Sequence, residues 1–187
     1  VLNKFNINPN NPILFFTGNH TSNKGLDIVR EISRNLKIKS TILIGGKLLN
    51  IEEPELFVKG FDNNNVEIIF TDFLSIIEQR AIYNISSLLL FPSKSDTLPL
   101  TIIEAMACSL PVIAFDVGGI SFLLNDECGF LINQNNTNKY LETITNALKN
   151  KFELEEMSKK ALARQKKLFS WSKAALKAKN IYETLNY

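Results

Sequence analysis

Residues 88–115 of the chain read LLLFPSKSDTLPLTIIEAMACSLPVIAF. Two short apolar runs, at 88–92 and 112–115, enclose a polar loop and a stretch with helical periodicity. A strand, a helix and a second strand in this order form the repeating unit of α/β proteins. The apolar residues of both runs are continuous instead of alternating, as in parallel strands that helices cover on both faces. This stretch therefore predicts an α/β fold.

The same alternation extends along most of the chain. Further strands are predicted at 13–18, 41–45, 66–70 and 129–132, and helices at 24–36, 76–84, 101–109 and 120–124. From residue 138 to about residue 187 the pattern is helical, with a break predicted near 169–172. Six parallel strands with right-handed crossovers are most often wound in the order 3-2-1-4-5-6, so we predict a Rossmann-like, doubly wound sheet with a helical tail.

Length and composition are those of one globular domain. The chain has 187 residues, of which 45% are hydrophobic and 21% charged. The net charge of +2 is too small to indicate a nucleic-acid partner. Cys108 and Cys128 lie in separate segments without metal-ligand spacing, so they are predicted to be buried thiols. We find no secretion signal and no apolar run of about 20 residues, and we expect a cytoplasmic protein.

The first loop expected to bind a ligand is 18–25, which reads GNHTSNKG. In the predicted winding, the first and fourth strands are neighbours where the order reverses, and ligands bind at that point. The loop has neither the dinucleotide-binding glycine pattern nor the Walker lysine pattern, which disfavours NAD binding and ATP hydrolysis. Lys24 is predicted to open the following helix, where a cation is unfavourable unless an anion shares the site. The position of Lys24 is a weak indication of a phosphate-binding site. The alternative is a lysine that is simply exposed to solvent at the start of a helix.

The second loop, 92–100, leads into a helix that carries Glu104. Asp96 and Glu104 are expected to point into one crevice, opposite Lys24. A cation facing two carboxylates suits a ligand with both a phosphate and several hydroxyl groups. Two structural alternatives remain: Thr101 and Glu104 have the spacing of a capping box, and Asp96 fits an Asx-type turn.

The string from 91 to 119 resembles the donor-binding motif of family 4 retaining glycosyltransferases of the GT-B fold, of the bacterial polysaccharide type. In that family a phrase similar to PSxxEGFGLxxLEAMAxGxPVIAxxVGG carries an E-x7-E pair. Upstream, 18–25 resembles GRLxxxKG, and downstream 129–132 resembles the GxLV strand. The FSWS of 169–172 is similar to the start of the family's terminal helix. The resemblance covers nearly the whole chain and implies the C-terminal half of a GT-B fold.

The resemblance implies a role for each charged residue of the two loops. Lys24 would bind the donor diphosphate, Asp96 would lie near the transferred sugar, and Glu104 would hold the ribose hydroxyls. It also implies donor-binding positions at both loops and at the helix N-terminus: Gly18, Asn19, Leu98, Leu100 and Thr101.

Three positions depart from the family pattern. Asn19 stands where the family usually has an arginine, which removes one cation from the diphosphate site. Asp96 is shorter by one methylene than the usual glutamate, and Phe122 replaces the acid that commonly follows the two glycines.

The activity that the resemblance implies is metal-independent, retaining transfer of a hexose from a UDP-, GDP- or ADP-sugar, without a cofactor. The chain has no Asp-x-Asp motif that would hold a cation. Because a GT-B enzyme has two Rossmann-like domains, we expect residues 1–187 to form the donor domain alone. A missing N-terminal domain would bind a glycan or lipid-linked acceptor, and the chain alone would not transfer sugar. The alternatives are a non-catalytic nucleotide- or sugar-binding module and a fragment of a GT-B nucleotide-sugar epimerase.

The C-terminal region has two further features. Eight basic residues and no acidic ones occur between 159 and 179, which suits either peripheral contact with the inner face of the membrane or a solvated helical face. The terminal helix, 170–187, has one apolar stripe, whose start is expected to pack in the core and whose end is expected to pack on the missing domain. The stripe consists of Trp171, Ala174, Ala178, Ile181, Tyr182 and Leu185.

Overall fold

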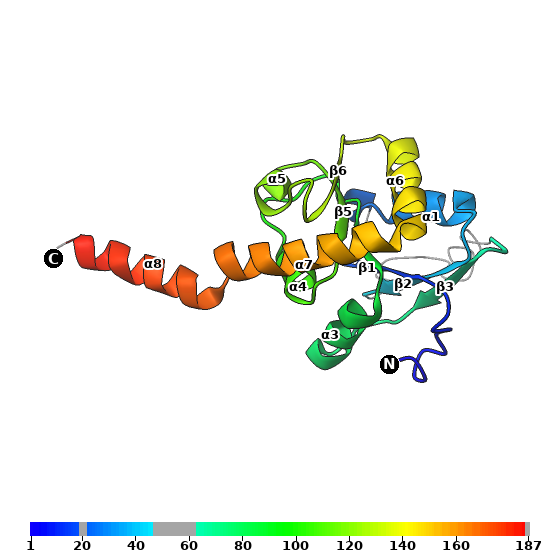
Figure 1. Cartoon of the computed structure of the whole chain (residues 1–187), viewed down its shortest axis with the longest axis horizontal. Helices are drawn as coiled ribbons and strands as arrows, with labels where there is room; N and C mark the ends of the chain where they lie inside the picture. Colours follow the sequence, from blue (N-terminus) through cyan, green and yellow to red (C-terminus); the bar gives the residue numbers. More distant parts are fainter. Residues whose placement is uncertain (19–21, 47–62, 186–187) are drawn as a thin grey trace.

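A parallel sheet forms the centre of the protein (Figure 1). The computed structural model describes residues 1–18, 22–46 and 63–185, and within them six strands pair in the order β3-β2-β1-β4-β5-β6. The strands are β1 Ile13–Thr17, β2 Ser40–Gly45, β3 Val66–Phe70, β4 Leu88–Phe91, β5 Val112–Phe115 and β6 Gly129–Ile132. The predicted strand order and the predicted Rossmann-like winding are therefore confirmed.

Helices cover both faces of the sheet, as continuous apolar strands require. The described helices are a 3-10 turn η1 at Ser22–Lys24, α1 Leu26–Asn35, α3 Ile76–Ile85, α4 Leu100–Ala107, α5 Ile120–Leu123, α6 Thr137–Lys149, α7 Lys151–Leu168 and α8 Trp171–Thr184. Helices α1 and α6 pack on one face, which includes Leu14, and α3, α4 and α7 pack on the other, which includes Phe15. Successive side chains of β1 thus enter different cores.

The C-terminal helical region is divided at two places, one of which the sequence pattern did not predict. The break expected near 169–172 is confirmed, because α7 ends at Leu168 and α8 begins at Trp171. A second break lies between α6 and α7 at Asn150. The side-chain oxygen of Asn150 accepts a hydrogen bond from the backbone N–H of Glu153 at 3.2 Å, so Asn150 begins a new helix.

The last two helices differ in packing. Helix α7 packs on α4 and buries Leu154, Met157 and Ala161, whereas α8 has no buried residue and extends away from the sheet (Figure 1). The core packing predicted for the start of the α8 stripe is wrong, since Trp171 is 79% exposed. The chain turns outward at Phe169 and carries Trp171 past the end of the core. The exposure expected at Ile181, Tyr182 and Leu185 is confirmed.

Most of the basic residues between 159 and 179 already bond within the chain. Lys159 pairs with Glu156 and Lys160 with Glu127, and the Arg164 side chain donates to two backbone carbonyls. Lys173 and Lys179 also have partners on α7 and α8 respectively. These contacts are those expected of a solvated helical face. No helix in the described ranges is both long enough and apolar enough to cross a membrane.

Candidate functional site

The loops after β1 and β4 lie against each other at the carboxyl edge of the sheet. Strands β1 and β4 are neighbours, with Leu14 opposite Leu88. The backbone N–H of Lys94 donates to the carbonyl of Asn23 at 2.8 Å. A Cβ atom on Gly25 would lie 2.1 Å from the carbonyl oxygen of Pro92, so only glycine permits this approach. The two loops predicted to form the ligand site are therefore in direct contact.

Lys24 and Asp96 form an ion pair between these loops. The Lys24 Nζ lies 2.8 Å from Asp96 Oδ2, and the two side chains are 33% and 16% exposed. The prediction that they face each other across an open crevice is thus wrong in detail, because the structure joins them. Asp96 bonds to this distant lysine and not to its own turn, which disfavours the Asx-turn alternative.

Lys24 does not open helix α1, in contrast to the sequence-based expectation. It ends the 3-10 turn η1, and α1 begins at Leu26. Gly25 separates the two with a left-handed φ of 81°, and its carbonyl accepts the hydrogen bonds of Ile28 and Val29 that start the helix. The ammonium group is therefore placed by the loop contact and not by the helix.

Two glycines after β5 hold the loop that carries Asp96. A Cβ atom would lie 1.8 Å from the Asp96 carbonyl oxygen if built on Gly118, and 2.2 Å from the Thr97 carbonyl oxygen if built on Gly119. The N–H of Gly119 also donates to the Thr97 carbonyl at 2.9 Å. In the sequence, this glycine pair stands out only as the end of the family motif. Adjacent glycines directly after a predicted strand are the signal that could have indicated a close backbone contact.

A second ion pair lies beside the first. Lys94 Nζ is 2.6 Å from Asp27 Oδ2, which joins the β4 loop to the first turn of α1. The other oxygen of Asp27 is buried and has no hydrogen-bond partner among the described residues. The Gln134 side chain donates to the Lys94 carbonyl at 3.0 Å. Sequence reasoning missed Asp27 and Lys94, because nothing in their spacing connects residues so far apart.

Glu104 lies apart from this ion pair, on the second turn of α4. The capping-box alternative is excluded, because α4 follows Pro99 and has no side-chain cap. Glu104 Oε2 instead accepts hydrogen bonds from Tyr83 Oη at 3.3 Å and Gln79 Nε2 at 3.4 Å, both on α3. Burial raises the pKa of Tyr83 well above its usual value, so the phenol stays protonated and able to donate.

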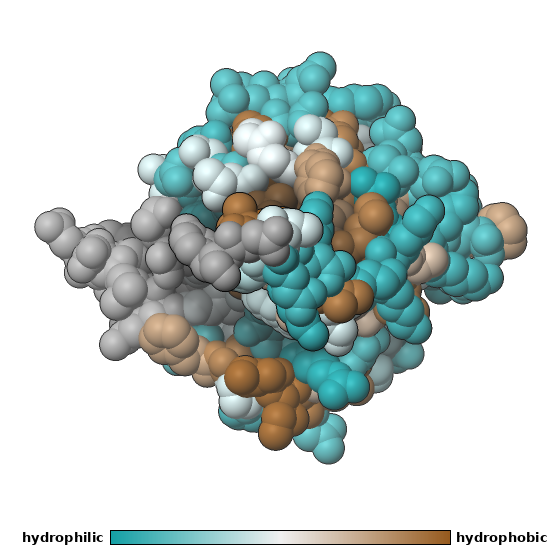
Figure 2. Space-filling view, turned by 90° about the vertical axis from the view of Figure 1, so that its left-hand side faces the viewer, coloured by the Kyte–Doolittle hydropathy of each residue, from teal (hydrophilic) through white to brown (hydrophobic). Residues whose placement is uncertain are grey.

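Glu104 stands between two hollows. One, of about 370 Å³, lies between α3 and α4 and is lined by Ile76, Gln79, Arg80, Tyr83, Glu104, Ala107 and Cys108. One lining residue, Ile76, is an exposed apolar side chain, and Phe73 and Ile77, which are close to it in the sequence, are exposed too. Figure 2 shows a hydrophobic patch on the lower part of one face of the molecule. The other hollow, of about 290 Å³, is bounded by Leu98, Leu100 and the α7–α8 junction. Cys128 is buried as predicted, but Cys108 is only half-buried at the first hollow.

The remaining predicted donor-binding positions surround the ion pair and the start of α4. A Cβ atom on Gly18 would meet no atom of the described residues within 4 Å. Leu98 and Leu100 are exposed and Thr101 is half-buried. Asn19 lies outside the described residues. Phe122 packs its ring edge-on against Phe169, with ring centres 5.8 Å apart, instead of facing the loops.

The described residues contain no group of three or more His, Cys, Asp and Glu side chains that could hold a metal ion. The groups gathered at the carboxyl edge are instead an ammonium group, carboxylates and free helix N-terminal amides. This combination can bind an anion and hydroxyl groups side by side.

Known proteins of similar sequence share one family. The family model "Glycosyl transferases group 1" matches residues 2–164. The trehalose synthase of Pyrococcus horikoshii is 30% identical over 183 residues, which cover 90% of this chain and 43% of that protein. The uncharacterized glycosyltransferase MJ1178 of Methanocaldococcus jannaschii is 29% identical over 172 residues, covering 91% of this chain and 48% of that protein. The chain thus spans about half the length of these relatives.

Solved structures of two further proteins have a similar fold. Sucrose-phosphate synthase from Thermosynechococcus elongatus superposes with a TM-score of 0.81 at 24% identity, covering 98% of this chain and 48% of that one. HepE of Anabaena, in complex with UDP-glucose, superposes with a TM-score of 0.78 at 20% identity, covering 94% of this chain and 49% of that one. The matched family model and the shared fold confirm the resemblance that the loop motifs indicated, and the chain belongs to the group 1 glycosyltransferases.

Proposed function

We propose that the chain binds the nucleotide part of a sugar nucleotide at the junction of the β1 and β4 loops and presents the sugar for transfer. The observation that carries this proposal is the placement of Lys24, Asp96 and the start of α4 together at the reversal point of the sheet. Membership of the group 1 glycosyltransferases supports it. So does a structural neighbour, HepE, which was solved in complex with UDP-glucose and with UDP.

The diphosphate would lie against Lys24 and the N-terminus of α4. Pro99 has no N–H, so the amides available there are those of Leu98, Leu100 and Thr101. No atom of the described residues lies within 4 Å of a Cβ built on Gly18, which would leave room for phosphate oxygens. As the bond between the sugar and the diphosphate breaks, its electron pair stays with the leaving phosphate, whose negative charge rises. A fixed hydrogen-bond donor aimed at such a charge typically lowers the activation free energy by about 3 to 4 kcal/mol.

The nucleoside would lie on the Glu104 side of the junction. The Glu104 carboxylate can accept hydrogen bonds from two ribose hydroxyls, while Tyr83 and Gln79 hold its orientation. The adjoining hollow between α3 and α4 includes the exposed apolar side chain of Ile76, on which a flat base can pack. This arrangement admits UDP, GDP or ADP as the nucleotide.

Asp96 would contact the sugar that is transferred. Its carboxylate can accept hydrogen bonds from sugar hydroxyls, and its charge favours the positive character that develops at the anomeric carbon. The reaction proposed is retaining, metal-independent transfer of a hexose to a glycan or lipid-linked acceptor in surface polysaccharide synthesis. In the lipid-linked case the enzyme would act in the cytoplasm, peripherally at the inner face of the membrane.

The acceptor would be bound by a second domain outside residues 1–187. The curated relatives are about twice as long as the matched segment, and the exposed apolar stripe of α8 suits packing on such a domain. The chain alone would then bind the donor without transferring the sugar. Holding donor and acceptor in the right orientation can lower the activation barrier by about 7 to 11 kcal/mol, and without the second domain this contribution is lost. A transfer assay on the 187-residue chain, beside a chain extended by a second domain, tests this division. Robust transfer by the shorter chain would contradict it.

Donor binding is tested by isothermal titration with UDP-, GDP- and ADP-glucose and with the three nucleoside diphosphates. We expect Lys24→Ala and Glu104→Ala to weaken binding of the best nucleoside diphosphate by at least about tenfold. Glu104→Ala should weaken it more than Asp96→Ala, because the bare nucleotide has the ribose but not the sugar. Lys37→Ala and Glu31→Ala remove the same charges from exposed positions and serve as controls. Failure to bind any of these nucleotides would contradict the proposal.

A further inference from the structure

The residue proposed to bind the diphosphate already has a carboxylate partner. Lys24 Nζ lies 2.8 Å from Asp96 Oδ2, and the Asp96 side chain is only 16% exposed. A diphosphate that takes the ammonium group as its own partner must loosen this pair. The Asp96 carboxylate is then left partly buried next to additional negative charge, and such a group is costly unless it finds new hydrogen-bond donors.

We infer that Asp96 makes the site prefer the intact sugar nucleotide over the nucleoside diphosphate product, by exchanging Lys24 for sugar hydroxyls. The inference rests on the proposed function. A bound sugar nucleotide takes Lys24 from Asp96 but offers hydroxyl donors in return. The product has no sugar, so its diphosphate takes Lys24 and leaves Asp96 without compensation. Asp96 is thus a specificity-determining residue, and re-formation of its pair with Lys24 favours release of the product.

The structure keeps Asp96 from avoiding this conflict by moving away. Its carbonyl oxygen is in contact with Gly118, where a Cβ atom would lie only 1.8 Å away, and the neighbouring Thr97 is bonded to Gly119. The backbone of the loop is therefore held while the carboxylate rotates.

The lysine of the β4 loop, Lys94, is already paired with a carboxylate. Lys94 is two residues from Asp96 in the sequence, but its ammonium group lies 2.6 Å from Asp27. Its backbone is also tied to Asn23 and Gln134. Lys94 therefore cannot replace Lys24 beside Asp96 without breaking its ion pair with Asp27 on α1, which leaves the hydroxyl donors of the ligand to compensate Asp96.

The test is isothermal titration of the 187-residue chain and of Asp96→Asn with UDP and with UDP-glucose, or with the GDP or ADP pair if one of those binds best. Asparagine keeps the shape of the side chain and removes the charge. We expect Asp96→Asn to bind UDP about two- to fivefold more tightly, because Lys24 is released. It should bind UDP-glucose about two- to fivefold more weakly, because hydroxyl acceptance by a carboxylate is lost. The ratio of the two dissociation constants thus shifts about tenfold.

Three variants make the result specific to this pair. Asp126→Asn removes the same charge from an exposed turn and should leave the ratio unchanged. Asp96→Ser, a second uncharged variant, should reproduce the tighter UDP binding. In a Lys24→Met background, Asp96→Asn should no longer tighten UDP binding, because no ammonium group is released.

The inference is overturned if Asp96→Asn and Asp96→Ser weaken UDP binding or leave the ratio of the two dissociation constants unchanged. It is also overturned if Asp126→Asn changes that ratio as much as Asp96→Asn does. Failure of the proposed function looks different, because the wild-type chain would then bind no member of the three nucleotide pairs.

Discussion

The loop junction at the carboxyl edge of the sheet and helix α8 are held by different forces. At the junction, glycines such as Gly25 and Gly118 admit backbone contacts that no side chain would allow. One ion pair joins the two loops, and a second joins the β4 loop to the first turn of α1. Helix α8 has a Ser170 cap and a pair between Lys179 and Glu183, but it buries no residue.

This difference separates tertiary from local stabilisation. The junction depends on contacts between segments about 70 residues apart, so its geometry is coupled to the stability of the whole domain. Helix α8 depends on its own sequence, and its apolar stripe remains available to a partner. Substitutions at the junction should therefore cost much more stability than matched substitutions on α8.

The largest effect is expected from Gly118→Ala. The new Cβ atom would lie 1.8 Å from the Asp96 carbonyl oxygen, and Gly118 has a left-handed φ of 56°. We expect a loss of about 3 to 5 kcal/mol in the free energy of unfolding, measured with urea. Gly18→Ala is the control, because Gly18 has a positive φ but a Cβ there would meet no atom of the described residues, and it should cost about 1 to 2 kcal/mol. Equal losses in the free energy of unfolding for the two variants would show that the close backbone contact at Gly118 does not contribute to stability.

Tyr140→Phe should have the next largest effect. The buried Tyr140 hydroxyl donates to the Ile113 carbonyl at 2.7 Å and accepts from the Phe91 N–H at 3.0 Å, which ties β5 to β4 below the junction. Loss of this hydroxyl leaves buried backbone groups without a partner, at a cost of about 2 to 3 kcal/mol in urea denaturation. On α8, Tyr182→Phe should change stability by less than about 0.5 kcal/mol. A loss at Tyr182 as large as that at Tyr140 would contradict the comparison.

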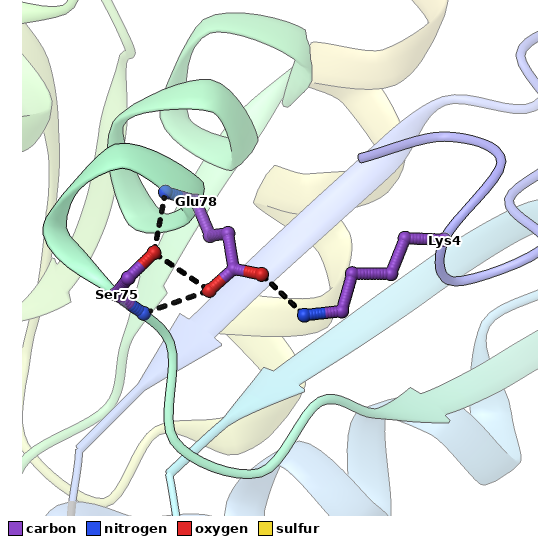
Figure 3. Close-up of polar contacts among 3 residues, drawn as sticks. All are labelled: Lys4, Ser75 and Glu78. Atoms are coloured by element: carbon purple, nitrogen blue, oxygen red, sulfur yellow. Dashed lines mark hydrogen bonds and ion pairs between the residues drawn. The ribbon is translucent and has the colours of Figure 1, made fainter.

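A smaller, pH-dependent effect is expected from Glu78→Gln at the start of α3. The Glu78 carboxylate bonds to Lys4 and to Ser75, with which it forms a capping box (Figure 3). These bonds lower the pKa of Glu78 from 4.5 to about 2, so their contribution is complete above pH 4.5 and is lost as the pH falls towards 2. The melting-temperature advantage of the wild type over Glu78→Gln should shrink across that window. Lys4→Met should remove most of this pH dependence, and an unchanged profile would contradict the assignment.

The smallest effect is expected from Trp171→Ala on α8. Because this side chain is 79% exposed, its loss should change the free energy of unfolding by less than about 0.5 kcal/mol. Leu154→Ala on α7 is the control, since Leu154 is buried and should cost about 2 to 4 kcal/mol. In a chain extended by a second domain, Trp171→Ala should become destabilising if α8 packs there. A loss above about 1 kcal/mol in the 187-residue chain would show that α8 is already packed.

The sequence by itself predicted the strand order, the two loops that meet at the reversal point of the sheet, and the family. Continuous apolar runs such as 88–91 need cover on both faces, and the most frequent winding of six such strands leaves β1 beside β4, as the structure shows. Local chemistry also predicted the break before Trp171. It missed the starts of helices at Leu26 and Lys151, where a single residue, Gly25 or Asn150, ends one helical segment and begins the next.

Only the tertiary structure decided which charged groups meet. Lys24 and Asp96 are 72 residues apart and Lys94 and Asp27 are 67 apart, so their pairing depends on the contact of two loops and not on spacing within either one. Glu104 has the spacing of a capping residue but bonds to α3, because helix packing brings Tyr83 within reach. The exposure of Trp171 is likewise a tertiary outcome: an apolar stripe predicts that a helix has a face to bury, but only the surrounding chain determines whether anything covers it.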